Sequence, residues 1–352
     1  MLSENDIRLL IKENPQANEG SSIKELIERG FLPQLEGAQI HEGKVTTSVT
    51  GEKLIRPSGA PIRLMFRNRR ISTHDKNRGE ISFKDQVLAI NHELMRGIVK
   101  PYIGSSQFEI EGLDPTSTVI ASEDLELLQF ENVMRQYMAV TSTETSLYKA
   151  WERAENNGAD TFTYAGKKFQ TSSLSPNCKL EELLFSPSTK EAVDKTISPK
   201  QLIEMGIISK GQWDRLKGES QAGFNAVQKY LNSKGLVLVD TKTEHGITRN
   251  SIVASADELY TMDSSRYWRL DPKTEKVAVD ERGNPISFSK EFARDLVKDP
   301  NTDMYSPEQQ IEIAIRYIQG IQHLTGEEFK PDLRPRDKRI ISSTKQILEY
   351  LL

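Results

Sequence analysis

Residues 235–241 read GLVLVDT, a nearly continuous run of apolar and β-branched residues. Such a run is typical of a buried strand. Charged residues appear only at its end, where Asp240, Lys242 and Glu244 follow at intervals of two. Because successive side chains of a strand point to opposite faces, these three are expected on the same face. The sequence therefore predicts a buried strand that ends in a charged face.

The segment after this strand predicts a hairpin. A turn at Arg249-Asn250 is followed by a return through residues 251–259, which brings Asp257 onto the strand that pairs with Glu244. Two facing carboxylates repel unless a cation lies between them, and Mg²⁺ held by carboxylates and nucleotide phosphates meets that need. An exposed hairpin with mixed charges fits the same spacing.

Length and composition exclude several classes of protein. The chain has 352 residues, which at about 150 residues per domain favours two lobes with a cleft between them. Its longest apolar runs fall short of the roughly eighteen residues that cross a bilayer, and Met1–Glu13 lacks the basic start of a secretory signal, so we expect a cytoplasmic protein with no membrane partner. With 47 Lys and Arg against 51 Asp and Glu, the net charge of -4 gives no reason to expect a nucleic-acid partner. The single cysteine, Cys178, excludes an internal disulfide and a Cys-rich zinc site.

The pattern along the chain divides it into four segments. Two short helices, with caps at Ser3 and at Ser22 followed by Glu25, are expected before Gly30. Residues 161–199 are rich in Ser, Thr, Pro and Lys, so a loop with little regular structure is expected there. We expect a helical extension over residues 1–38, a small strand-rich lobe with one helix (84–96) over residues 39–130, a larger α+β lobe with helices from 199 and over 211–232 in residues 131–330, and a tail over residues 331–352.

Two blocks resemble the paired signatures of one enzyme family. VDTKTEHG (239–246) and ADELYTMDSSRYW (256–268) are similar to the D-x-K-x-E-F-G strand and the D-E-x-x-T-P-D-S-S-R segment of SAICAR synthetases. Further blocks agree in the family's order from about residue 40 to 330. They are HEGKV (41–45), RISTHD (70–75), FENVMR (130–135), FSPSTK (185–190), SKEFARD (289–295) and LTG (324–326).

The resemblance implies an α+β fold with a kinase-like small lobe and an ATP-grasp-related large lobe, and ATP and Mg²⁺ as cofactors. It assigns Gly43 and Lys44 to the ATP phosphates, and Glu131 to the ATP ribose. Glu244 and Asp257 then hold Mg²⁺. Taken alone, a lone lysine is commonly a surface residue and Glu131 is equally a solvated carboxylate between lobes.

The same family pattern assigns a set of residues to an imidazole ribonucleotide. Arginine forks suit carboxylate and phosphate groups, and the pattern puts Lys242 between the nucleotide and the substrate carboxylate. Asp263 before two serines is also a routine turn or helix cap. The implied substrate-binding residues are Asp75, Arg135, Lys242, Asp263, Ser264, Ser265 and Arg266.

The implied reaction is formation of an amide between the ribonucleotide carboxylate and L-aspartate. A carboxylate is a poor acylating agent, and phosphorylation by ATP converts it to an acyl phosphate that the amine can attack. Lys44 and Lys242 are the implied catalytic residues, because their ammonium groups offset the charge that builds between two anions. The partners are then small molecules.

The sequence departs from the family pattern at several positions. Val140 stands in a segment where the family has a glycine-serine end, and a side chain there obstructs close approach of backbone to a phosphate. Two alternatives therefore accompany SAICAR synthesis, a related ligase with another nucleotide or amine and a non-catalytic nucleotide-binding protein. The tail over residues 331–352 covers the lobe or mediates self-association as a homo-oligomer. The other departures are Thr46-Thr47, Arg69, His74, His245 and Met262.

Overall fold

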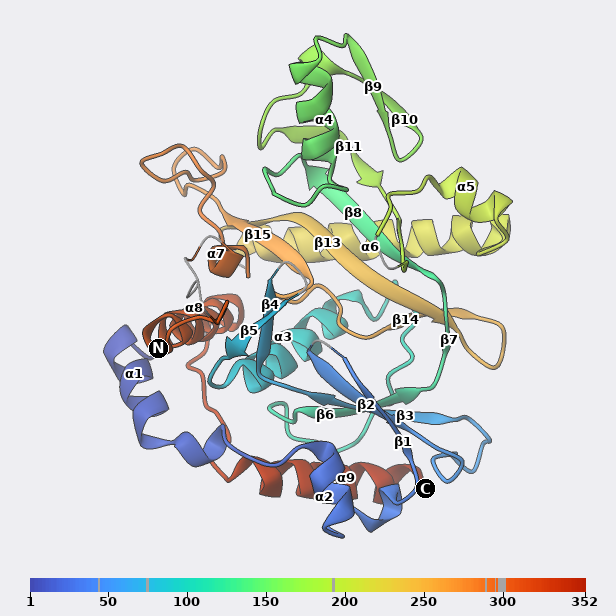
Figure 1. The fold of residues 1–352 in the computed structure, drawn as a ribbon, viewed down its shortest axis with the longest axis vertical. Coiled ribbons are helices and arrows are strands. Elements are labelled where there is room, and N and C mark those ends of the chain that lie inside the picture. The colour runs from blue at the N-terminus through green and yellow to red at the C-terminus, as the bar shows by residue number, and fades with distance from the viewer. Residues whose placement is uncertain (44, 74–75, 192–193, 289, 295, 297–301) are drawn as a thin grey trace. The chain divides into compact units, whose positions relative to one another are not determined.

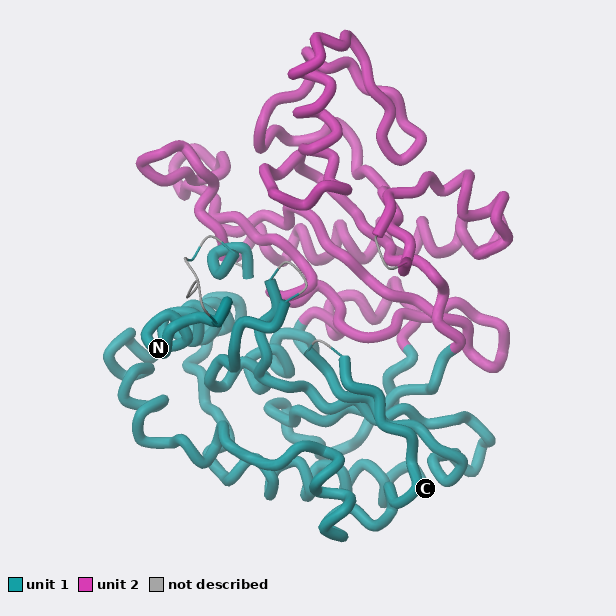
Figure 2. Tube along the Cα trace, viewed as in Figure 1, with its two compact units in different colours: residues 1–94, 106–125, 290–352 teal, residues 95–105, 126–289 magenta. Residues whose placement is uncertain are grey.

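The computed structural model describes residues 1–352 except 44, 74–75, 192–193, 289, 295 and 297–301. The chain forms two compact units (Figure 2). Unit 1 comprises residues 1–94, 106–125 and 290–352, and unit 2 comprises residues 95–105 and 126–289. Over the described part of the chain, no helix combines the length and the apolar character needed to cross a membrane.

Unit 1 is built on a four-stranded antiparallel sheet. Its order is β1 (Gln39–Glu42), β2 (Thr46–Thr50), β3 (Ile62–Arg67) and β6 (Val119–Glu123). A second hairpin consists of β4 (Arg70–Thr73) and β5 (Lys76–Glu80). Helix α3 (Lys84–Val99) begins in this unit, where a helix over residues 84–96 was predicted. Two further helices of unit 1 are α7 (Glu291–Arg294) and α8 (Pro307–Thr325), the latter ended by Gly326 in the left-handed conformation.

Residues 23–35 near the N-terminus and the C-terminal helix pack on the four-stranded sheet of unit 1 (Figure 1). Leu26 and Leu35 near the N-terminus share one apolar core with Phe66 of β3 and with Ile347 and Leu351 near the C-terminus. This burial explains why both terminal segments are ordered, since each supplies one face of a core. The C-terminal helix begins at Arg336, within the predicted tail. The elements are α1 (Glu4–Glu13), η1 (Pro15–Ala17), α2 (Ile23–Glu28), η2 (Pro33–Leu35) and α9 (Arg336–Leu351).

The two predicted N-terminal caps are present. Ser3 Oγ accepts from the backbone N–H of Asp6, and Ser22 Oγ accepts from that of Glu25. Each acidic residue in turn accepts from the backbone N–H of its serine, which completes a capping box. The prediction of two short capped helices is confirmed.

Unit 2 contains the long strand predicted at GLVLVDT. This strand, β13 (Leu236–Ile247), pairs antiparallel with β8 (Phe130–Tyr137) and with β14 (Val253–Ala256), and β11 (Lys179–Phe185) extends the sheet beyond β8. Helix α6 (Lys210–Ser233) lies along β13 (Figure 1). The remaining elements around it are β7 (Glu126–Leu127), β12 (Ser188–Thr189), α5 (Pro199–Glu204) and β15 (Ser265–Arg269).

The prediction that residues 161–199 have little regular structure is wrong. A hairpin of β9 (Thr161–Tyr164) and β10 (Lys167–Gln170) is closed by Ala165 and Gly166, both at positive φ (49° and 79°), as in a two-residue β-turn. The rings of Phe162 and Phe169 stack across it, with centroids 5.4 Å apart. Their packing against α4 (Leu147–Asn156) offsets the polar composition that suggested a loop. The turn η3 (Thr171–Ser173), β11 and β12 follow.

Candidate functional site

The two faces of β13 have different surroundings. Thr241, Thr243 and His245 are buried on the face that α6 covers. Asn132 of β8 shares this face, because it lies opposite Thr243, and its Nδ2 donates to Ser220 Oγ of α6 at 3.1 Å. The alternating residues Asp240, Lys242 and Glu244 therefore lie on the other face, as the sequence predicted.

Strand β8 brings Glu131 and Arg135 to this charged face. Asp240 lies opposite Arg135, and Lys242 lies opposite Val133. Lys242 Nζ donates to Glu131 Oε1 at 2.5 Å. Burial by itself lowers the pKa of Lys242, but the attraction of Glu131, Glu244 and Asp257 outweighs it and raises that pKa. Lys242 is therefore an ammonium group that contacts Glu131 and is stabilised by the negative charges of Glu244 and Asp257.

Glu244 lies in β13, and Asp257 directly follows the end of β14, the returning strand of the predicted hairpin. Glu244 lies opposite Ala256, so Asp257 follows directly after its partner position, with its backbone in the left-handed region at φ 58°. Asp tolerates that region better than most residues. Glu244 also forms an ion pair with Lys190, whose Nζ lies 2.5 Å from Glu244 Oε2.

Glu244 and Asp257 are the residues here that could hold Mg²⁺. No group of three or more His, Cys, Asp or Glu side chains suited to a metal occurs among the residues that the structure describes. Mg²⁺ is commonly bound by one or two carboxylates, with substrate phosphates and water completing its coordination. Glu244 and Asp257 supply such a pair, and both act electrostatically on the same ammonium.

Two arginines converge on one buried carboxylate. Asp240 is 6% exposed and accepts from Arg266 through Nε at 2.8 Å and through Nη2. Arg135 Nη1 donates to Oδ2 of the same carboxylate at 3.0 Å, and its Nε donates to Ser186 Oγ at 3.0 Å. The planes of both guanidinium groups are thus set by hydrogen bonds that run along the sheet.

The predicted Asp263-Ser264-Ser265 segment is divided between two environments. Ser265 Oγ lies 2.8 Å from Thr241 Oγ1, on the face of β13 that α6 covers, so its hydroxyl does not join the charged face. Ser264 Oγ accepts from the backbone N–H of Thr261 at 3.0 Å within the turn before β15. The backbone N–H of Asp263 donates to Thr261 Oγ1 at 3.3 Å in the same turn.

The glycine turn in unit 1 is closed by its own backbone. Gly43 N donates to Thr46 O at 2.8 Å, and a Cβ at Gly43 would lie 2.7 Å from that oxygen. Arg70 Nη2 donates to Gly43 O at 2.8 Å and to Glu42 Oε2 at 3.1 Å. Two predicted site residues in the sequence range of unit 1, Lys44 and Asp75, lie outside the described residues.

The sequence reasoning assigned no role to two residues that contact the predicted set. Lys190 ends the FSPSTK block that supported the family resemblance, so that block was the available signal. Asp240 belongs to the same alternation as Lys242 and Glu244, but the sequence did not predict which residues it contacts. Its arginine contacts depend on pairing between distant strands.

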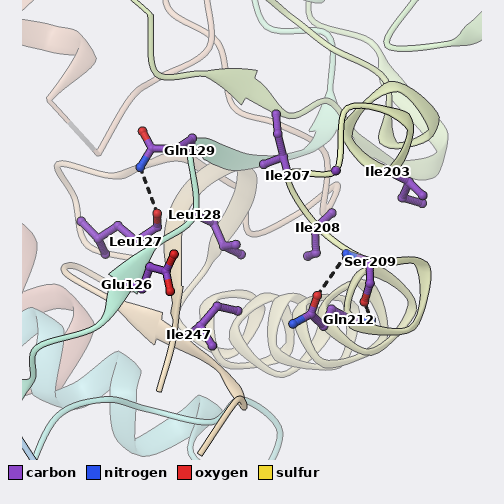
Figure 3. Close-up of a pocket in the computed structure, with 11 residues that line it drawn as sticks. Glu126, Leu127, Leu128, Gln129, Ile203, Ile207, Ile208, Ser209, Gln212 and Ile247 are labelled. Carbon is purple, nitrogen blue, oxygen red and sulfur yellow. Dashed lines mark hydrogen bonds between the residues drawn. The ribbon is translucent and has the colours of Figure 1, made fainter. Parts of the chain in front are cut away.

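A cavity of about 450 Å³ lies elsewhere in unit 2 (Figure 3). Ile247, which the alternation of β13 places on the face covered by α6, lines it together with Leu128, Ile207 and Ile208. The Gln129 side-chain amide donates to Leu127 O at 3.0 Å rather than into the cavity. None of the predicted site residues that the structure describes lines it.

Comparison with known proteins identifies the family of the chain. The sequence model of the SAICAR synthetase family matches residues 55–310. A relative from Agrobacterium fabrum is 29% identical over 320 residues, 87% of this chain and 93% of its own length. The phosphoribosylaminoimidazole-succinocarboxamide synthase of Legionella pneumophila (strain Lens) is 31% identical over 63% of this chain and 70% of its own. The chloroplastic synthase of that name from Arabidopsis thaliana is 30% identical over 80% of this chain and 68% of its own.

Solved structures show the same α+β fold. The SAICAR synthase of Saccharomyces cerevisiae, complexed with SAICAR, matches with a TM-score of 0.66 at 20% identity, over 89% of this chain and 99% of the yeast chain. A SAICAR synthetase in complex with ADP matches with a TM-score of 0.57 at 19% identity, over 83% of this chain and all of its own. The predicted α+β fold is therefore confirmed, and the chain belongs, as a divergent member, to the SAICAR synthetase family.

Proposed function

We propose that this protein joins L-aspartate to the carboxylate of carboxyaminoimidazole ribonucleotide in an ATP-dependent ligation, the SAICAR-forming step of purine biosynthesis, in the cytoplasm. One observation carries the proposal. Three kinds of group follow one another along a single face of β13 and its neighbouring strands. They are the carboxylates of Glu244 and Asp257, the ammonium group of Lys242, and the guanidinium groups of Arg135 and Arg266. Family membership and the names of the relatives support the same reaction.

The two ends of this face suit different parts of the reaction. Glu244 and Asp257 would hold Mg²⁺, which when bound supplies positive charge between the phosphates of ATP. Arg135 and Arg266, held in plane by Asp240, present N–H groups suited to the anionic groups of the ribonucleotide. Lys242 lies between the two ends, where its ammonium attracts the substrate carboxylate toward the nucleotide.

The chemistry divides into two displacements. In the first, an oxygen of the imidazole carboxylate attacks the γ-phosphorus, the bond to the bridging oxygen breaks, and ADP leaves. In the second, the aspartate amine attacks the acyl carbon, phosphate leaves, and the amine loses a proton. Both steps gather negative charge near Lys242, so the chain contributes mainly by positioning and neutralisation.

The test is phosphate release by the purified protein. With Mg-ATP, the carboxyaminoimidazole ribonucleotide and L-aspartate, we expect release that requires all three substrates and falls by at least about a hundredfold in Glu244→Gln. Glu182→Gln is the matched control, because Glu182 is an exposed strand residue that pairs with Lys167 on the surface. ATP binding without release would contradict the proposal.

A second candidate is a ligase of the same chemistry that accepts a different nucleotide or amine. Val140 motivates it, since this residue is 43% exposed and its backbone N–H donates to Asn177 Oδ1 at 3.0 Å. A backbone amide engaged in that way is less available to a phosphate. Release with a changed acceptor, and none with the usual one, would favour this candidate. Nucleotide binding with no turnover on any acceptor would favour a non-catalytic protein.

A further inference from the structure

Lys190 and Glu244 form a close ion pair inside the charged face. Lys190 Nζ lies 2.5 Å from Glu244 Oε2, and the two side chains are 23% and 22% exposed. Partly buried pairs are less screened by water than surface pairs, so this contact is stronger than an ordinary surface salt bridge. A proposed metal-binding carboxylate thus already carries a cation supplied by the protein.

The backbone that precedes Lys190 is held in place by strand pairing and hydrogen bonds. Lys190 follows β12, in which Ser188 pairs with Glu131 of β8. The backbone N–H of Thr189 donates to Lys195 O at 2.9 Å, and Lys195 N donates to Thr189 Oγ1 at 3.2 Å. The strand contacts therefore fix where the lysine side chain begins, while its four-carbon stem leaves the ammonium several positions to occupy.

Charge around the pair favours exchange over permanent attachment. Lys242 is paired with Glu131, and Lys190 is paired with Glu244. A divalent cation on Glu244 would repel the Lys190 ammonium, and nucleotide phosphates would attract it.

We propose that Lys190 is an exchangeable counter-ion. Its ammonium occupies the metal-binding carboxylate of Glu244 until the metal and nucleotide arrive, and then moves to the nucleotide phosphates. The inference rests on the proposed role of Glu244 as a metal ligand. It assigns Lys190 two opposite effects, weaker metal binding before nucleotide arrives and tighter nucleotide binding afterwards.

Direct metal binding tests the first effect. Mn²⁺ serves as the probe, and free Mn²⁺ is measured by electron paramagnetic resonance with the full-length protein. Without nucleotide, we expect Lys190→Met to bind Mn²⁺ about tenfold more tightly than the wild type, because the competing ammonium is gone. Titration calorimetry with ADP and saturating Mg²⁺ tests the second effect, and there we expect Lys190→Met to bind about tenfold more weakly.

Two further variants separate this role from a structural one. Lys195→Met removes one positive charge from the same segment, where Lys195 pairs with Glu191 at 2.9 Å and is 68% exposed, and we expect no change in either measurement. Lys190→Arg keeps a cation on Glu244 and should retain the weak metal binding of the wild type. Thermal unfolding of each variant shows that it is folded.

The outcomes distinguish the inference from the function on which it rests. If the wild type binds Mn²⁺ with ADP but Lys190→Met binds Mn²⁺ no more tightly without nucleotide, the exchange is wrong and the metal site stands. If the folded wild type binds no Mn²⁺ even with ADP, the metal role of Glu244 fails and the exchange fails with it. Opposite shifts in the two measurements, confined to Lys190→Met, establish the exchange.

Discussion

Arg266 and Asp240 form a two-point contact across neighbouring strands, with Arg266 Nε 2.8 Å from Asp240 Oδ1 and Nη2 donating to Oδ2. The two residues lie opposite each other in the β13–β15 pairing. Because the carboxylate is buried and also accepts from Arg135, it sets the orientation of both guanidinium groups. Asp240 is therefore expected to act through the arginines rather than by touching a substrate.

Asp240→Asn tests this positioning role. The amide keeps the shape of the side chain but loses its charge and one acceptor. Both arginines therefore lose part of the hydrogen bonding that orients their guanidinium groups. We expect affinity for the imidazole ribonucleotide to fall about tenfold, which corresponds to about 1.4 kcal/mol, while affinity for ADP stays unchanged. Titration calorimetry with each ligand measures both.

Asp124→Asn is the control for Asp240→Asn. Asp124 also accepts from an arginine, Arg63 Nε at 2.8 Å, but that pair lies in unit 1 and involves none of the predicted site residues. Equal losses in both variants, or loss of ADP binding in Asp240→Asn, would contradict a role specific to the ribonucleotide.

Gly43→Ala tests the glycine turn of unit 1. The added methyl group would lie 2.7 Å from the carbonyl oxygen of Thr46, and backbone cannot move aside as a flexible side chain can. We expect the turn to open and ADP affinity to fall by about tenfold or more. Gly51→Ala at the other end of β2 is the control, since its methyl group meets Ala38 at an ordinary 3.4 Å. An unchanged ADP affinity in Gly43→Ala would remove this turn from the nucleotide site.

His245 predicts a pH dependence of stability. Its burial lowers its pKa to about 4 from an ordinary value of 6.5, so the folded protein holds it neutral. Between these two values the unfolded chain binds a proton that the folded chain does not, so stability falls as pH falls from about 6.5 toward 4. The loss approaches about 3 kcal/mol over that range.

His245→Phe should reduce this pH dependence, because Phe has no proton to gain. The measurement is urea unfolding of wild type and variant at pH 7.5 and at pH 5. We expect the free energy of unfolding of the variant, relative to that of the wild type, to be higher at pH 5 than at pH 7.5. The same difference at both pH values would contradict the assignment to His245.

Two glycines of α6 predict opposite effects on stability. A methyl group at Gly223 would lie 2.5 Å from Ile103 Cδ1 and 3.2 Å from the hydroxyl of Tyr260, so Gly223→Ala overpacks a buried contact and should cost about 1–3 kcal/mol. A methyl group at Gly218 of the same helix has no atom within 4 Å, so Gly218→Ala should stabilise the protein by up to about 1 kcal/mol. Thermal and urea unfolding of both variants check the sign. Destabilisation by both would contradict the packing argument.

The sequence by itself determined what depends on local pattern. The spacing of Asp240, Lys242 and Glu244 predicted one charged face of a strand, because alternation is a property of any extended chain. Ser3 and Ser22 predicted helix starts, because a cap involves only residues three positions apart. The ordered blocks from about residue 40 to 330 predicted the family and its α+β fold.

The tertiary structure decided which charged groups meet. Arg135 and Asp240 are 105 positions apart in the chain, and Lys242 and Glu131 are 111 apart, yet each pair forms a contact. Strand register set those contacts and turned the Ser265 hydroxyl toward the covered face, while the packing of Phe162 and Phe169 against α4 stabilises the hairpin of β9 and β10. No local pattern carries this information, because cross-strand neighbours depend on which distant strands pair and in which register.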